Sequence, residues 1–154
     1  VLFRSMKRSK KLTPVVDIAV KAVERALIKV GQANSAWQQD KQQLDDLHRY
    51  KGEYLARFRQ GDSMMISAQK MLDLRAFLVQ LDQAIAAQQQ QVENSYKKVQ
   101  YQQQEWLQAH TKEQAMQTLV GRYKAEESQQ ELRREQLDND EHNTSQWVRK
   151  PRQD

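Results

Sequence analysis

The sequence contains no cysteine, and only 2 of its 154 residues are proline and 4 are glycine. The absence of cysteine excludes disulfides, thiolate metal sites and cysteine nucleophiles. The scarcity of proline and glycine leaves long stretches without helix breakers. No run of about 18 apolar residues occurs, and no apolar signal-peptide core follows the basic start, so we expect neither a membrane span nor a secretion signal.

Patterns that carry enzyme chemistry are absent as well. His48, His110 and His142 are isolated and do not form a pair of histidine metal ligands on one helical face. No glycine-rich phosphate loop occurs, and Asp45 and Asp46 point in different directions on a helix without a pocket to raise either pKa. We therefore predict a protein that is not an enzyme, with no catalytic residue, no metal site and no cofactor.

The net charge of +5 arises at one end of the chain. Five of the 25 basic residues lie in the first twelve, which contain no acidic residue: Arg4, Lys7, Arg8, Lys10 and Lys11. The remainder is neutral and has no basic stripe along a helix, so we expect no nucleic-acid partner. The basic arm either contacts phosphates or anionic lipid headgroups, or is a solvated tail.

Composition divides the chain into three parts. We expect a basic disordered arm over residues 1–12, a coiled-coil hairpin over 13–140 and a disordered tail over 141–154. Residues 1–5 precede Met6 and fit neither helix pattern, so we expect them to be non-native.

An apolar residue recurs every seven positions in two long stretches, which predicts an all-α, coiled-coil structure. In the first stretch the repeat is Val16, Val23, Val30, Trp37, Leu44 and Phe58, with Val20, Leu27 and Leu55 four positions on. In the second it is Met71, Leu78, Ile85, Val92, Val99, Trp106 and Val120, joined by Leu74, Leu81, Ala109, Met116 and Tyr123. The 25 glutamines also favour long solvated helices.

Local signals place the ends of the two helices. Thr13 is a candidate N-cap with Pro14 at the first helical position, and the first helix is expected to end near Gln60. Gly61 is suited to closing that helix. Candidate caps for the second helix are Asp62, Ser63 and Ser67.

A short connection between two long helices makes them antiparallel. The second helix is expected to run to about Leu137, so that residues 113–137 overhang the first helix. This overhang either docks onto another molecule or frays.

Polar residues interrupt the predicted contact line between the helices. On the first helix they are Asn34, Lys41, His48 and Lys51, and on the second Gln88, Ser95 and Gln102. They either fix the register or make the hairpin soft enough to bend, and register control is the favoured interpretation.

A second stripe runs beside this line, close to the turn. Its members are spaced i, i+4, i+7 and i+11 on each helix: Gln43, Leu47, Tyr50 and Tyr54, then Phe77, Leu81, Ala84 and Gln88. Because the helices are antiparallel, we expect the two stripes to merge into one aromatic surface that flanks the contact line. It either binds a partner or thickens the packing near the turn.

The segments Leu44–Tyr54 and Phe77–Gln88, with Gly61 between them, resemble the Leu…Tyr…Glu-Tyr…Gly…Phe-Leu…Leu…Ala-Ile…Gln pattern of the flagellar FliJ family. The resemblance implies a hairpin similar to the central stalk of rotary ATPases, acting in flagellar type III protein export. The implied partners are the flagellar export ATPase ring, the cytoplasmic domain of the export gate membrane protein and export chaperones. The implied location is the cytoplasmic side of the inner membrane at the flagellar base, without membrane insertion.

Carried onto this sequence, the gate-binding residues of the family are Gln43, Leu47, Tyr50, Tyr54, Phe77, Leu81, Ala84 and Gln88. Gln88 departs from relatives that carry histidine there. Two other functions stay open at this point: the stalk protein of injectisome secretion, and a structural coiled coil that homodimerises into a four-helix bundle.

Overall fold

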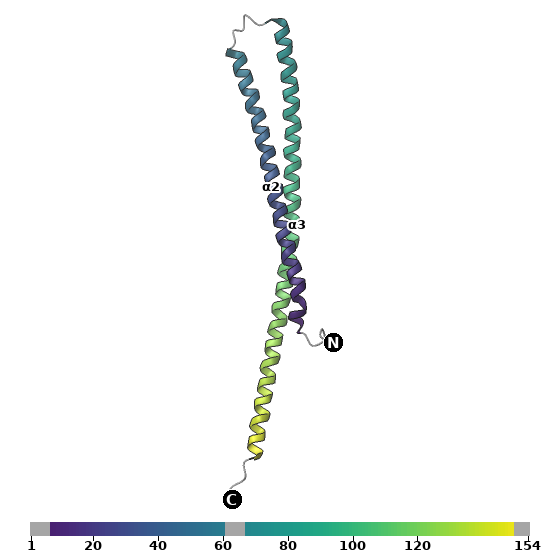
Figure 1. Cartoon of the computed structure of the whole chain (residues 1–154), viewed down its shortest axis with the longest axis vertical. Coiled ribbons are helices and arrows are strands. Elements are labelled where there is room, and N and C mark those ends of the chain that lie inside the picture. Colours follow the sequence, from purple (N-terminus) through teal and green to yellow (C-terminus); the bar gives the residue numbers. More distant parts are fainter. Residues whose placement is uncertain (1–6, 61–66, 150–154) are drawn as a thin grey trace. The chain divides into compact units, whose positions relative to one another are not determined.

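The computed structural model describes residues 7–60 and 67–149, which form two helices, α2 (Arg8–Gln60) and α3 (Ala68–Arg149) (Figure 1). The helices contain 53 and 82 residues. Residues group into two units, one combining 1–23 with 109–154 and the other spanning 24–108. Within each unit a portion of α2 packs antiparallel to a portion of α3, so the predicted all-α hairpin with a longer second helix is confirmed.

The start of α3 follows the sequence signal. The hydroxyl of Ser67 accepts a hydrogen bond of 3.2 Å from the backbone N–H of Lys70, and the Ser67 carbonyl accepts 3.1 Å from that of Met71. Ser67 is therefore the N-cap of α3. The other turn signals, Gly61, Asp62 and Ser63, lie outside the described residues.

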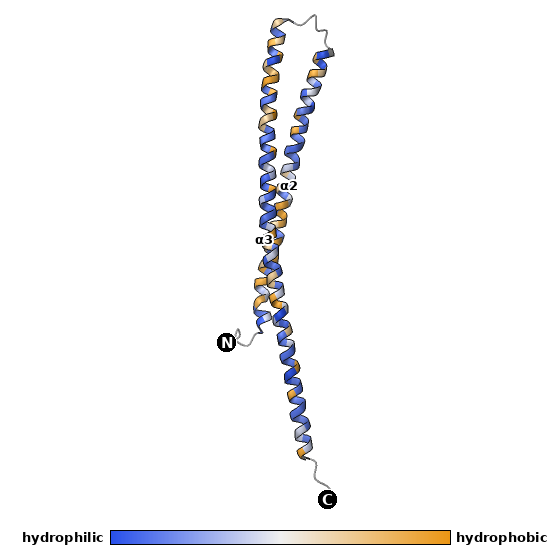
Figure 2. Cartoon of the chain, turned by 180° about the vertical axis from the view of Figure 1, so that it is seen from behind, coloured by the Kyte–Doolittle hydropathy of each residue, from blue (hydrophilic) through white to orange (hydrophobic). Residues whose placement is uncertain are grey.

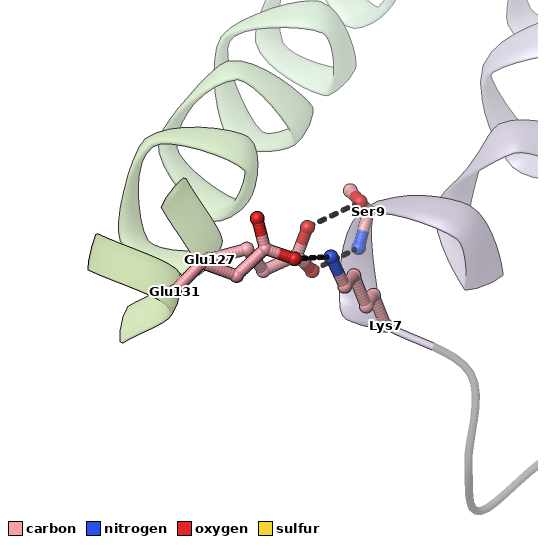
Figure 3. Close-up of polar contacts among 4 residues, drawn as sticks. All are labelled: Lys7, Ser9, Glu127 and Glu131. Atoms are coloured by element: carbon pink, nitrogen blue, oxygen red, sulfur yellow. Dashed lines mark hydrogen bonds and ion pairs between the residues drawn. The ribbon is translucent and has the colours of Figure 1, made fainter. Parts of the chain in front are cut away.

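The predicted start of α2 is wrong. Pro14 lies inside the helix, which begins at Arg8, and the Thr13 hydroxyl donates to the Ser9 carbonyl at 3.3 Å instead of capping. The cap comes from α3, because the Glu127 carboxylate accepts hydrogen bonds from the Ser9 N–H at 3.1 Å and the Ser9 hydroxyl at 2.7 Å (Figure 3). A carboxylate at a helix N-terminus satisfies free N–H groups and complements the helix dipole. Residues 8–12, assigned to the basic arm, are therefore helical.

The start of α2 also shortens the predicted overhang. Lys7 forms an ion pair of 2.6 Å with Glu131, and the guanidinium of Arg8 lies 5.7 Å from the centre of the Tyr123 ring. Val120 is buried. Residues 113–127, expected to project past α2, therefore pack against it, and every side chain from 128 to 148 is exposed. The helix continues through this exposed segment to Arg149, beyond the predicted end near Leu137.

The contact line between the helices, here called the seam, consists of the buried and part-buried positions that alternate three and four residues apart. On α3 the predicted seam is correct from Leu74 onward, with Leu81 and Ile85 buried. On α2 the positions three residues after each repeat position are buried or part-buried as far as Tyr54, with Ala19 and Ala26 buried. Of the predicted companions four residues on, Val20 and Leu55 are part-buried, whereas Leu27 is 58% exposed. Figure 2 shows how thinly apolar residues are spread along both helices.

Polar residues within the second unit tie the two helices together. Asp40, on the α2 seam, accepts hydrogen bonds from the Ser95 hydroxyl and, at 3.4 Å, from the Gln91 amide. The Gln88 amide donates to the Asp40 carbonyl at 2.9 Å. Because these bonds connect the side chain and backbone of one residue to fixed positions on the facing helix, they support the register interpretation of the polar seam.

Candidate protein-binding site

Three aromatic side chains of the second unit meet beside the seam. The ring centres of Tyr54 and Phe77 are 4.5 Å apart, and those of Tyr50 and Phe77 are 6.1 Å apart at an interplanar angle of 75°. Tilted and edge-on arrangements at these separations are favourable for aromatic pairs. The predicted merging of the α2 and α3 stripes into one aromatic surface is therefore correct for these three residues.

The eight predicted site residues do not all flank the seam, as the spacing suggested. Four belong to the seam itself, and four lie beside it on one face. The seam members are Leu47, Tyr54, Leu81 and Gln88, and the flanking members are Gln43, Tyr50, Phe77 and Ala84. A spacing of i, i+4, i+7, i+11 alternates between two neighbouring helix rows, so half of the stripe falls on the seam.

Exposure follows this division. Leu81 is 6% exposed and Tyr50 is 49% exposed. Gln43 and Ala84 are exposed, whereas Phe77 is half-buried under the two tyrosines. A partner can therefore contact Tyr50 directly, while Leu81 acts on such a surface only through the packing beneath it.

A shallow groove of about 550 Å³ opens beside Tyr50. It is lined by Gln43, Asp46, Leu47, Arg49, Tyr50, Glu53 and Gln88. Four of these residues were predicted; the charged members Asp46, Arg49 and Glu53 were not. The signal was available for two of them, because Asp46 and Glu53 each follow a predicted residue by three positions, which is one helical turn.

The charged residues give this groove a polar rim. The Asp46 carboxylate accepts hydrogen bonds from Arg49 at 2.8 Å and from Gln42 at 3.0 Å. An ion pair of 2.5 Å between Lys51 and Asp82 joins the helices near the aromatic cluster. An apolar and aromatic centre with a charged rim is the usual composition of a protein–protein contact surface.

A second groove, of about 530 Å³, continues toward the turn. Its lining includes Tyr54 and Phe77 together with Phe58 and Leu74, and it carries both charges through Arg57, Lys70 and Asp73. Leu81 and Ala84 line neither groove.

In the first unit, contacts at the start of α2 shift the pKa values of three side chains. Hydrogen bonding by the Ser9 hydroxyl lowers the pKa of Glu127, and the Lys7 ammonium, by hydrogen bond and by charge, lowers the pKa of Glu131. The same Glu131 contact raises the pKa of Lys7. Among residues 7–60 and 67–149, no three histidine, aspartate or glutamate side chains are grouped to hold a metal ion. In the same ranges, neither helix contains a stretch long and apolar enough to cross a membrane.

The family model described as the flagellar FliJ protein matches residues 8–152. No individual curated protein matches the chain. Because the match covers both helices, the chain belongs to the flagellar FliJ protein family. Membership implies a non-enzymatic component of the flagellar export apparatus, associated with the flagellar base.

Proposed function

From this family membership, we propose that the chain couples the flagellar export ATPase ring to the export gate by binding the cytoplasmic domain of the gate membrane protein through the aromatic face of its second unit. In this role it also assists export chaperones, and it acts in the cytoplasm, peripherally associated with the inner membrane. The observation that supports the gate-binding part is the aromatic cluster in which Tyr50 and Phe77, on one face, pack with the seam residue Tyr54.

The cluster has the properties of a binding hot spot. Tyr50 presents about half of its surface to solvent, while its ring is held edge-on against Phe77. A tyrosine that is fixed before binding loses little side-chain entropy when a partner covers it. Tyrosine is also among the residues that most often dominate the free energy of protein–protein binding.

The rest of the predicted stripe has a supporting role in this proposal. Gln43, Tyr50, Phe77 and Ala84 form the contact surface, and Leu47, Tyr54, Leu81 and Gln88 hold it from the seam. The Gln88 amide is hydrogen-bonded to the Asp40 carbonyl, so its side chain is already engaged within the hairpin. In this chain the glutamine at position 88, where relatives can carry histidine, makes this bond through its side-chain amide.

The ATPase-coupling part of the proposal rests on the family and on the antiparallel hairpin, a form for which the family resemblance implies a likeness to the central stalk of rotary ATPases. No motif identifies the residues that contact the ring. The proposal assigns the face around Tyr50 to the gate alone, so it predicts that ATPase stimulation does not depend on Tyr50.

Isothermal titration of the purified gate cytoplasmic domain against the wild type and Tyr50→Ala tests the proposal. We expect Tyr50→Ala to weaken binding by about 2 kcal/mol, on the order of thirtyfold in Kd, because a fixed aromatic contact is lost. Ile28→Ala, which removes an exposed residue outside the groove, is the control and is expected to bind as the wild type does.

Stimulation of the cognate ATPase is measured on the same proteins. We expect Tyr50→Ala to stimulate hydrolysis as well as the wild type. Unchanged gate binding by Tyr50→Ala would contradict the gate surface, and a wild-type protein that fails to stimulate the ATPase at saturation would contradict the coupling role.

A further inference from the structure

A different groove, of about 720 Å³, runs between the helices of the second unit, close to residues 24 and 108 where that unit ends. It is lined by Leu27, Val30, Gln100, Gln103, Gln104, Trp106 and Leu107. Both leucines of the lining are open to solvent, Leu27 at 58% and Leu107 at 49% exposure. The groove is larger than the one beside Tyr50, and the proposed gate contact does not use it; Val30 and Trp106 of its lining belong to the seam.

This groove flanks the seam on the side opposite the aromatic face. Leu27 and Leu107 each follow a seam residue, Ala26 and Trp106, whereas Tyr50 precedes the seam residue Lys51. In a heptad repeat, the position after a seam residue and the position before one lie on opposite flanks of the contact line. A partner in this groove therefore leaves the Tyr50 face open.

None of the seven lining residues carries a charge, although 29% of the whole sequence is charged. An occupant that buried a charged side chain here would find no counterion among the lining residues and would lose part of its hydration. The amides of Gln100, Gln103 and Gln104 offer hydrogen bonds to neutral polar groups. The electrostatics of the groove therefore match a partner surface of aliphatic and neutral polar side chains.

A glycine lies next to this wall. Gly31 is one turn from Leu27, has an ordinary helical backbone, and a Cβ added to it would meet no atom within 4 Å. Glycine in a helix interior is less favourable than alanine, and neither the conformation nor the packing of the hairpin requires it here. The absence of a side chain lets the backbone of a neighbouring element approach α2 closely.

The structure assigns this groove as a docking site for one amphipathic helix of a partner protein, whose contacting face carries aliphatic and neutral polar side chains and no charge. A groove between two antiparallel helices is filled by a third helix lying along it, which completes a three-helix bundle. A second copy of the chain is a poorer match, since it would place one concave groove against another.

The probe is a fluorescein-labelled amphipathic peptide of about six helical turns, with leucine at the seam positions, glutamine beside them and Lys/Glu pairs on the far face. A matched peptide carries lysine in place of the glutamines beside the seam. Fluorescence anisotropy against the full-length protein measures Kd for both. We expect saturable binding of the neutral-faced peptide and at least tenfold weaker binding of the lysine-faced one.

Variants of the protein test whether the peptide binds in this groove. Leu27→Lys and Leu107→Lys should each raise Kd for the neutral-faced peptide at least tenfold, because each introduces an unpaired charge into the groove. Ile28→Lys is the matched control, since Ile28 is also aliphatic and 61% exposed but does not line the groove, and its Kd should stay within twofold. Both leucines are open to solvent, and circular dichroism checks that the variants keep the helicity of the wild type.

Three results would overturn this assignment. They are no saturable binding of the neutral-faced peptide, equal binding of both peptides, and equal effects of Leu27→Lys and Ile28→Lys. A wild-type dimer in sedimentation that Leu27→Lys dissociates would also overturn it, in favour of a second copy as the occupant. The assignment is independent of the gate proposal, because Leu27→Lys should bind the gate domain as the wild type does.

Discussion

Replacing Leu81 by alanine tests how much a buried seam residue contributes to the free energy of unfolding of the hairpin. Leu81 is 6% exposed and lies on the α3 seam, so truncation removes carbons that are almost fully buried. At about 0.8 kcal/mol per buried carbon, the loss is about 2.4 kcal/mol. A residual cavity adds to this value, which lies within the range of about 2–5 kcal/mol for core leucines.

Leu72→Ala is the matched control, because it makes the same chemical change on the same helix. Leu72 is 59% exposed, so the same scaling gives about 1 kcal/mol or less. Urea denaturation followed by circular dichroism measures both variants. For an m-value of about 2 kcal/mol/M, we expect the Leu81→Ala midpoint to fall by about 1 M and the Leu72→Ala midpoint by less than half of that. Equal shifts of the two midpoints would refute the assignment of Leu81 to the seam.

Two further predictions concern the first unit. Glu127→Gln should lower the melting temperature at neutral pH, because the carboxylate caps α2, whereas the exposed neighbour change Glu126→Gln should not. The pKa of Glu127 is lowered in the folded protein, so its contribution is present above the ordinary carboxyl pKa and is lost as pH falls through the folded value; a wild-type advantage in melting temperature that persisted in strong acid would contradict this cap. Pro14→Ala should raise the free energy of unfolding by about 1–3 kcal/mol, since Pro14 is exposed and removes a backbone hydrogen bond from the interior of α2. A lower urea midpoint in the variant would show that the proline has a role the helix geometry does not explain.

The seam of α3 was predictable because its apolar residues are large. Leu74, Leu81 and Ile85 give a clear heptad signal, and the structure buries all three. On α2 the companion positions three residues after the repeat hold Ala19 and Ala26, which carry little hydrophobic signal. Positions three and four residues after a repeat position are both compatible with a heptad. The larger Leu27 was therefore assigned to the seam, although it faces solvent.

The ends of the helices depended on contacts that no local pattern contains. Thr13 and Pro14 form a sound N-terminal signal, yet the cap of α2 comes from Glu127, 118 residues from Ser9 along the chain. A tertiary contact thus overrides the local propensity. Because α2 begins earlier than predicted, the predicted overhang was also too long. In the candidate site, spacing identified which residues come together, but the division between seam and surface required the register of α2 against α3.

The central claim, that the face around Tyr50 contacts the export gate, is tested most directly by site-specific photo-crosslinking. A photoreactive amino acid replaces Tyr50 in one protein and the exposed Ile28 in another, and each is irradiated with the purified gate cytoplasmic domain. The account predicts a covalent product with the gate domain from position 50 and none from position 28. A product from position 28 without one from position 50 would contradict it.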